Sequence, residues 1–212
     1  MRSLPLFPLN VVLFPGRPLQ LRVFEPRYRR MLEDCARGDN RFGVVLISEG
    51  VEVGGEAVPH EVGTVARIAE SGDRLGEVIP LTVVGERRFR ILGLDRSLPY
   101  LSGEVEELPE PANDGLGEET WSAAREAAAR FVRAFLMYER GEWLASPSLP
   151  DDPMELGYQM GALVSSVRPY DAQAALEADT VSGLLESVIA PLGLASRHLE
   201  ALAADRGSFS SN

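Results

Sequence analysis

The chain opens with the stretch that decides its fold, LPLFPLNVVLFPGRPLQLRVFEPRYRRMLEDC, from Leu4 to Cys35. Prolines and a glycine separate three short apolar runs here, and such residues end strands and set turns. Glu25-Pro26 then introduces a segment with helical spacing, because proline suits the first position of a helix. The apolar face of this helix, at i, i+3, i+4 and i+7, consists of Tyr28, Met31, Leu32 and Cys35. The stretch therefore predicts short strands followed by one amphipathic helix that stops at Gly38.

The apolar runs up to residue 108 are short, rich in strand-forming residues and separated by Gly, Pro, Asp and Ser. In one of them, Phe89 and Ile91 alternate with Arg88 and Arg90, which is the pattern of a strand with one buried face. Several such strands with one helix predict a small barrel. The strand candidates are residues 4–7, 19–23, 42–47, 62–70, 78–84, 87–94 and 100–106.

The pattern changes to a helical period after residues 108–117, a segment with the Pro, Gly, Asn and Asp content of a linker. We therefore expect one domain over residues 1–110, a helical domain over 116–206 and a frayed tail at 207–212. The expected helices are a long one from Trp121, a second with Asp152 as N-cap and Pro153 at its first position, a short third capped by Asp171, a fourth from about Asp179 that breaks or kinks at Pro191, and a last one from about Leu194.

The opening stretch resembles the start of the Lon protease N-terminal domain, the substrate-binding module that is also found at the front of cereblon and in stand-alone bacterial proteins. Weaker matches cover nearly the whole chain, at residues 41–46, 62–66, 84–90, 99–101, 169–173 and 176–179. The resemblance implies an α+β fold, with a PUA-like β-barrel and one helix followed by a C-terminal helical bundle. It also implies a module that binds polypeptide substrates or a partner protein, for example as an adaptor in protein quality control.

The chain contains no lysine, because all 21 of its basic residues are arginine. A phosphate-binding P-loop needs a lysine that reaches the β- and γ-phosphates, and a Ser-Lys dyad needs an amine that can lose its proton. The nucleotide-binding ATPase and the Ser-Lys protease of complete Lon proteases are therefore both excluded from these 212 residues. We expect a stand-alone family member without ATPase or protease domains, which is not an enzyme and needs no cofactor.

Charge and cysteine content narrow the possible partners. The formal net charge is −11 and the pI is about 4.7, which counts against binding to nucleic acid. The prolines near the N-terminus leave no uninterrupted apolar leader, and no later run is long enough to span a membrane. Cys35 is the single cysteine, so an intrachain disulfide and a multi-thiolate metal site are both excluded. We expect a cytoplasmic protein.

Candidates for catalysis and metal binding are few. Cys35 lies on the apolar face of its helix, which favours core packing over nucleophilic chemistry. His60-Glu61 begins like the zinc-protease pattern HExxH, but Thr64 stands where the second histidine is needed. His198 lies beside Arg197 and is expected at the surface, and the acidic pairs are typical of solvated faces. We therefore predict neither a catalytic nor a metal site.

Arginines interleaved with aromatic residues leave two functions open. Such clusters could stack on bases, so an RNA-binding PUA-like protein is the alternative to a peptide-binding module. For Arg27, pairing with Glu25 or another acid within the module is the favoured interpretation. A surface arginine can also clamp a peptide carboxylate. The predicted peptide contacts are Phe14, Arg17, Phe24, Tyr28, Arg30 and Arg88.

Overall fold

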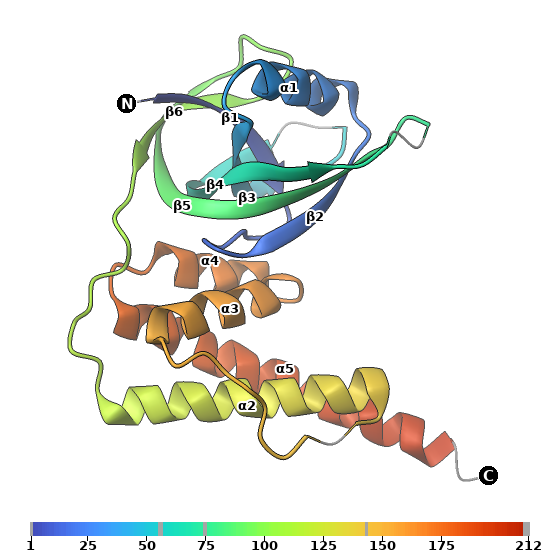
Figure 1. Cartoon of the computed structure of the whole chain (residues 1–212), viewed down its shortest axis with the longest axis vertical. Coiled ribbons are helices and arrows are strands. Elements are labelled where there is room, and N and C mark those ends of the chain that lie inside the picture. The colour runs from blue at the N-terminus through green and yellow to red at the C-terminus, as the bar shows by residue number, and fades with distance from the viewer. Residues whose placement is uncertain (1, 55–56, 74–75, 143, 210–212) are drawn as a thin grey trace. The chain divides into compact units, whose positions relative to one another are not determined.

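The computed structural model describes residues 2–54, 57–73, 76–142 and 144–209. They form two compact units, Met1–Glu110 and Pro111–Asn212, which are called unit 1 and unit 2 below. Unit 1 contains a sheet and one helix, α1 (Pro26–Arg37), and unit 2 is helical throughout its regular elements (Figure 1).

The described part of unit 1 forms a mixed sheet of six strands in the order β2-β5-β4-β3-β1-β6. A further pairing between β5 and β6 closes a circuit of five strands. Among the residues that the structure describes, β2 lies outside this circuit and pairs with β5 alone. The β1–β3 pair is parallel and the other pairs are antiparallel. The strands are β1 (Arg2–Leu9), β2 (Pro18–Val23), β3 (Arg41–Gly50), β4 (Ala57–Ser71), β5 (Ile79–Asp95) and β6 (Ser102–Glu107).

Helix α1 covers the main core of unit 1, as its sequence periodicity predicts. Its four apolar residues, Tyr28, Met31, Leu32 and Cys35, are buried and pack with residues of the sheet such as Phe7 and Phe42 (Figure 1). The middle strands are apolar on both faces, because Val44 belongs to this core whereas Val45 packs with Phe89 in a second one. The helix ends at the expected residue, with the Gly38 N–H bonded to the Cys35 carbonyl.

Two strands that the sequence predicted, at residues 78–84 and 87–94, are one continuous strand, β5. The interruption at Gly85-Glu86 is a bulge rather than a turn, since Thr64 faces Arg88 while Ala66 faces Gly85. Gly85 is needed there because a Cβ would collide with the main-chain oxygen of Phe14. The Gly16 N–H and the Arg17 carbonyl both bond to Gly85, at 2.9 and 3.0 Å, so the segment before β2 lies directly on β5.

The bulge also places Glu86 among arginines of β3, β4 and its own strand, β5. Arg41 of β3 donates two hydrogen bonds to its carboxylate, at 2.6 and 2.9 Å. Arg67 of β4 and Arg87 of β5 lie at 3.2 and 3.8 Å from the same group. The hydrogen bonds from Arg41 hold the pKa of Glu86 below its ordinary value.

Unit 2 is built from α2 (Glu118–Arg140), α3 (Pro153–Ser165), α4 (Pro169–Glu177) and α5 (Val181–Phe209). The predicted N-cap of α3 is confirmed, with Asp152 accepting a hydrogen bond of 2.8 Å from the Glu155 N–H. Helices α3 and α5 pack closely, because Gly157 leaves no space for a Cβ beside Leu184. The expected cap of α4 is wrong. Arg168 occupies the N-cap position, and Asp171 lies within the first turn as the ion-pair partner of Arg168.

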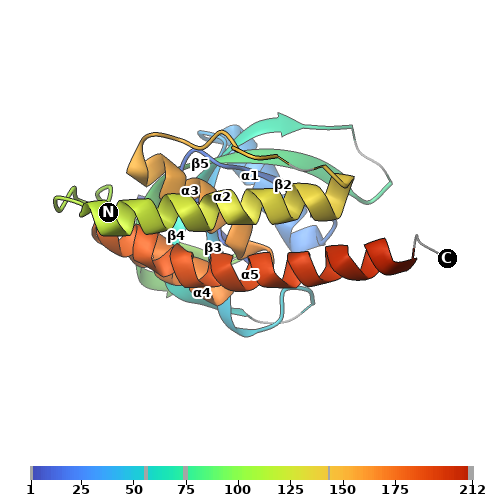
Figure 2. The same cartoon turned by 90° about the horizontal axis from the view of Figure 1, so that it is seen from below.

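Helix α5 is continuous through Pro191, so the expected break and separate last helix are wrong. Packing of its buried residues against α2, α3 and α4 outweighs the local cost of a proline in a helix. Helices α2 and α5 lie side by side and run in the same direction (Figures 1 and 2). Two pairs along them show this: Asp114 bonds to Ser182 before α2, and Arg130 pairs with Glu200 further along.

The predicted linker is tied to each unit by main-chain contacts. On the unit 1 side, the Leu108 N–H bonds to the Arg88 carbonyl. On the unit 2 side, the Ala112 N–H bonds to Asp179 and its carbonyl accepts from Val181. The expected tail at 207–212 is helical as far as Phe209, and residues 210–212 lie outside the described residues.

We predict that Gly85→Ala lowers the free energy of unfolding by about 1–3 kcal/mol, because the added Cβ collides with main-chain atoms that cannot move aside. Gly93→Ala is the matched control. It lies in the same strand, and no atom lies within 4 Å of its added Cβ. Urea unfolding of both variants measures the difference, and equal midpoints would contradict the close approach.

We further predict that Glu86→Gln costs about 1–2 kcal/mol of stability at neutral pH. Because the pKa of Glu86 is lowered on folding, the stabilisation is fully present above its unfolded value near 4.5 and is lost as the pH falls through the lower folded pKa. The variant should therefore lose less stability than the wild type between pH 7 and pH 3. Thermal unfolding across this range tests the prediction, and parallel pH profiles would refute it.

Candidate functional site

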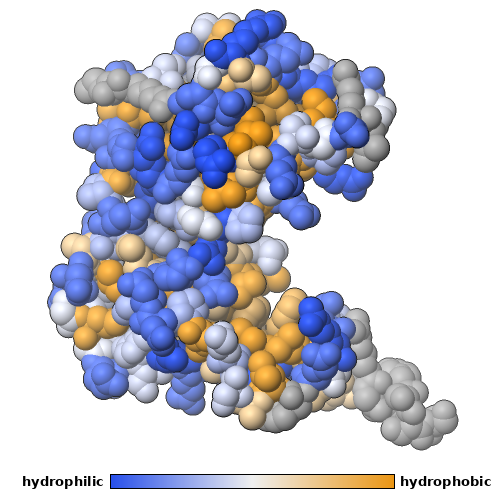
Figure 3. Space-filling model, in the orientation of Figure 1, coloured by the Kyte–Doolittle hydropathy of each residue, from blue (hydrophilic) through white to orange (hydrophobic). Residues whose placement is uncertain are grey.

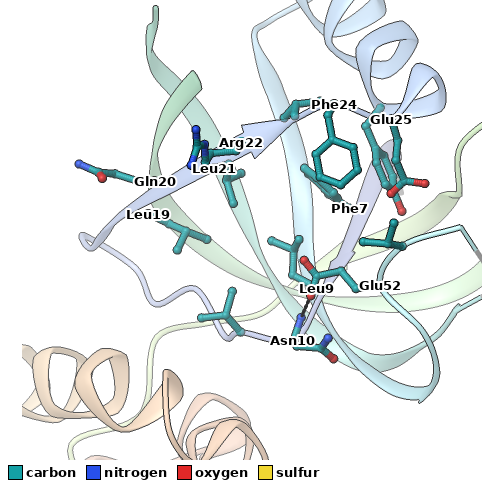
Figure 4. A pocket seen from close by; sticks show the side chains of 14 residues that line it. Phe7, Leu9, Asn10, Leu19, Gln20, Leu21, Arg22, Phe24, Glu25 and Glu52 are labelled. Atoms are coloured by element: carbon teal, nitrogen blue, oxygen red, sulfur yellow. Dashed lines mark hydrogen bonds between the residues drawn. The ribbon is translucent and has the colours of Figure 1, made fainter. Parts of the chain in front are cut away.

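Unit 1 contains a pocket of about 420 Å³ beside the strand that pairs on one side only. The end of β1, the whole of β2 after Pro18, the start of α1 and residues 52–53 form its walls. Figure 4 shows Phe24 and Phe7 toward α1, Leu19 on the opposite side, and Asn10 and Glu52 closing the lower rim. Apolar side chains thus form the interior and polar groups stand at its edge.

The pocket forms where β2 ends and α1 begins with almost no connecting residues. Glu25 has the extended backbone of a helix N-cap position and Pro26 follows at the first helical position, so β2 gives way to α1 within two residues. Phe24 lies at this junction and is 45% exposed, although it is large and apolar. An exposed aromatic residue at the rim of an apolar pocket is typical of a binding surface.

A small polar network fixes the rim. Glu25 accepts hydrogen bonds from the Arg27 guanidinium at 3.1 Å and from the Gly54 N–H at 3.3 Å. Glu52 accepts one from the Asn10 N–H at 3.0 Å (Figure 4), and Arg27 donates to the main-chain carbonyl of Glu52. The predicted pairing of Arg27 with Glu25 is confirmed, and it holds residues 52–54 against the start of α1.

Tyr28 forms part of the pocket wall and part of the core. The centroids of the Tyr28 and Phe7 rings are 4.1 Å apart. The Arg27 guanidinium also contacts the Tyr28 ring, at 4.6 Å from its centroid. Burial raises the pKa of the Tyr28 hydroxyl, so this group stays protonated at physiological pH. Tyr28 can offer a ring surface and a hydrogen bond, but it is not a base.

The structure brings together two of the six predicted contact residues, Phe24 and Tyr28, in this pocket. Arg30 is exposed on α1, where it pairs with Asp34 and does not line the pocket. Arg17 is half-buried at the bend before β2, and its main chain bonds to Phe14 and Gly85.

Phe14 and Arg88 need correction as surface contacts. Phe14 is fully buried because its segment is pressed onto β5 at Gly85. Arg88 is 2% exposed and donates a hydrogen bond to the Pro109 carbonyl, so it holds the end of unit 1 rather than a ligand. Arg88 shares a face of β5 with the exposed Arg90, as the alternation in 87–94 predicts. It is nevertheless buried, because it stands opposite the buried Thr64, where the Leu13 carbonyl accepts a hydrogen bond from the Thr64 hydroxyl and the preceding segment covers this face.

Sequence reasoning missed several residues of the pocket. Leu9 and Val11 lie near the end of β1, and Glu52 and Val53 lie between the predicted strands at 42–47 and 62–70. The available signal was the pair of valines at 51 and 53, which are both 55% exposed. Exposed valines between glycines are unusual for a purely solvated loop.

Unit 2 has a second apolar pocket of about 320 Å³. It is lined by Phe131 and Phe135 of α2, Leu163 near the end of α3, Val167 just after α3, and Leu194 of α5. Apolar residues also gather over the C-terminal half of α2 in the space-filling view (Figure 3). His198 is exposed, as expected, and it also forms part of the wall of this pocket.

Groups with catalytic potential are not assembled in the part of the chain that the structure describes. No cluster of three or more His, Cys, Asp or Glu residues able to hold a metal ion occurs there. The Cys35 thiol is buried and donates to the Arg41 carbonyl, and burial raises its pKa to about 11. Such a thiol remains protonated and is a poor nucleophile.

Comparison with known proteins identifies the family of this fold. Residues 3–192 match the substrate-binding domain of the ATP-dependent protease La (LON). The chain belongs to this family. The assignment to Lon N-terminal domains from the opening stretch is therefore confirmed, and the match covers both units.

Solved structures and curated relatives agree with this assignment to the Lon family. A Lon N-terminal domain protein from Xanthomonas campestris is 29% identical with a TM-score of 0.63, covering 90% of this chain and 98% of that one. The N-terminal domain of the Mycobacterium avium complex Lon protease is 18% identical with a TM-score of 0.64, covering 91% of this chain and 98% of that one, which shows the shared fold.

Among curated proteins, Lon protease 2 of Sorangium cellulosum is 29% identical over 94% of this chain, and Lon protease 2 of Myxococcus xanthus is 36% identical over 49%. The aligned parts amount to 25% and 13% of those two proteases. The similarity to the Lon proteases thus concerns their substrate-binding domain. Within the described residues, no helix is long and apolar enough to cross a membrane.

We predict that Cys35 in the native protein reacts with a thiol reagent at pH 8 at least about 100-fold more slowly than in the unfolded protein, because its folded pKa is about 11 and its side chain is buried. Rates measured with and without denaturant test this. Rapid modification of the native protein would show that the thiol is accessible and that α1 is not packed as described.

Proposed function

We propose that this Lon-family domain is a non-enzymatic module that binds unfolded segments of other polypeptides in the pocket between β2 and α1. One observation carries the proposal: an apolar pocket of about 420 Å³, with the 45% exposed Phe24 on its rim, lies beside a strand that pairs on one side only. An extended peptide can bond to such an edge through its main chain while its side chains enter the pocket.

The composition of the pocket supports a polypeptide ligand over a small polar molecule. Its interior is provided by residues such as Phe7, Leu9 and Leu21, and both carboxylates at its rim already accept hydrogen bonds from the protein, Glu25 from Arg27 and Glu52 from the Asn10 N–H. Such a surface gains free energy mainly by removing apolar side chains from water, at about 25 cal/mol per Å². Unfolded proteins expose many such side chains and folded ones few.

The absence of lysine fits a binding role, since it excludes P-loop and Ser-Lys chemistry within these 212 residues. The protonated thiol of Cys35 adds no nucleophile. We therefore propose that the domain acts as an adaptor in protein quality control, presenting bound segments to a separate protease. The single buried cysteine also suits a reducing, cytoplasmic compartment.

We also propose that unit 1 is a PUA-like barrel, supported by the closed circuit of pairings through β5, β4, β3, β1 and β6. RNA binding, which such barrels also suggest, is the weaker alternative. Three of the arginines close to aromatic residues are engaged by carboxylates: Arg27 by Glu25, Arg29 by Glu77, and Arg30 by Asp34. Their positive charge is therefore largely neutralised.

We predict that Phe24→Ser weakens binding to a permanently unfolded, reduced and carboxymethylated test protein by about 5-fold to 10-fold, because the pocket loses its exposed aromatic rim. The matched control is Leu94→Ser, since Leu94 is 42% exposed in the same unit but lies outside the pocket. Fluorescence anisotropy gives both dissociation constants.

Equal weakening by Phe24→Ser and Leu94→Ser would show that the unfolded protein does not bind specifically in this pocket. Failure of the wild type to distinguish the unfolded test protein from its folded form would overturn the proposed function itself. Binding of single-stranded RNA that weakens steeply as salt rises would favour the alternative.

A further inference from the structure

The pairing of β2 with β5 determines which main-chain groups of β2 face the pocket. In an antiparallel pair, every second residue exchanges both its N–H and C=O bonds with the partner, and the residues between point away. Arg22 stands opposite Pro80, and proline has no N–H to donate. Arg22 therefore belongs to the set that points away from β5, together with Gln20.

Two further contacts also indicate that the main-chain groups of Gln20 and Arg22 point away from β5. The Gly85 N–H donates to the Arg17 carbonyl at 3.0 Å, which places residues of odd number in β2 on the side of β5. On the other edge of β5, the Pro80 carbonyl accepts from the Gly72 N–H at 3.0 Å and is thus turned toward β4. The N–H and C=O groups of Gln20 and Arg22 consequently lie on the open edge of β2, and both residues line the pocket.

Side chains of β2 alternate between two faces. Leu21 and Val23 are buried in the core, whereas Gln20 and Arg22 are exposed. Figure 4 shows Gln20 and Arg22 projecting away from the side on which Leu19 lies. A strand added to this edge would continue the pleat, so its side chains would alternate between the apolar interior of the pocket and the outer face.

We propose that the site recognises extended segments in which apolar residues alternate with polar ones, with a carboxylate at the outward position opposite Arg22. This inference rests on the proposed function and specifies its substrate class. Main-chain bonds to Gln20 and Arg22 fix the register, and the apolar side chains at alternate positions then enter the pocket formed by residues such as Leu9 and Val11. If the same apolar residues had helical spacing, an extended segment would direct some of them into the pocket and others to the outer face.

Arg22 supplies the charge preference. Its side chain is exposed on the outer face, and within the described residues it forms no ion pair. Opposite charges directly across two strands stabilise pairing, and like charges destabilise it. An aspartate or glutamate opposite Arg22 is therefore favoured, and a lysine there is disfavoured.

Synthetic peptides with a fluorescent label test the substrate class by anisotropy. The first has valine at every second position, serine and threonine between, and one central aspartate on the polar face. The second has the same composition with the valines at helical spacing, and we expect it to bind roughly 10-fold or more weakly. The third replaces the aspartate by lysine, and we expect roughly 3-fold weaker binding.

Two variants of the protein test the register. Gln20→Pro removes an edge N–H without touching the bonds to β5, just as Pro18 is accommodated two residues earlier, and we expect roughly 5-fold to 10-fold weaker binding. Gln20→Ala, which keeps the N–H, is its control and should bind as the wild type does. Arg22→Glu should reverse the preference between the aspartate and lysine peptides, and it remains informative if Gln20→Pro folds poorly.

The outcomes separate this inference from the proposed function. Binding of the unfolded test protein without any advantage for the alternating peptide would overturn the substrate class alone. Binding of neither would overturn both. Unchanged affinity in folded Gln20→Pro, or no charge reversal in Arg22→Glu, would refute recognition at this edge. If the wild type forms dimers, Gln20→Pro abolishes them and no peptide binds, then the edge of β2 pairs with a second copy of the chain. This result would refute the inference.

Discussion

Where the chain passes from Phe14 to Arg17 it lies directly against Gly85 of β5, with no room for a side chain between them. The two main-chain bonds made there align the segment that follows, so β2 enters its pairing with β5 in a single register. That register directs Leu21 toward the core and leaves Arg22 outside. One steric constraint on β5 thus controls both the packing of the edge strand and the groups that it leaves open.

Local signals in the sequence predicted much of the fold. The apolar spacing of α1 and the cap at Asp152 depend on a few neighbouring residues, and both agree with the structure. The continuity of β5 and α5 could not be predicted in this way. Gly85 and Pro191 are local breakers, but pairing on both edges of β5 and packing around α5 keep these elements intact. Tertiary contacts between residues far apart in sequence decided both cases.

The pocket was only partly predictable for a related reason. Phe24 and Tyr28 belong to the motif around Pro26, and both line the pocket. Phe14 belongs to the same stretch, yet it is buried, because its position depends on the contact with β5 and not on its neighbours. Glu52 reaches the pocket from a segment after β3, and no spacing in the sequence connects it with Asn10.

Strand β2 is short, since Pro18 opens it and Pro26 follows soon after its end at Val23. An edge of this length offers few main-chain bonds, each with a net value of about 1 kcal/mol. In the proposed binding mode, even with apolar side chains added, a complex at this edge would be of roughly micromolar strength and would last on the order of a second. Such brief contacts would suit the proposed adaptor role, in which bound segments are passed to a protease. A short edge strand also offers little main chain to the strands of other copies, which is one of the ways in which proteins limit aggregation through sheet edges.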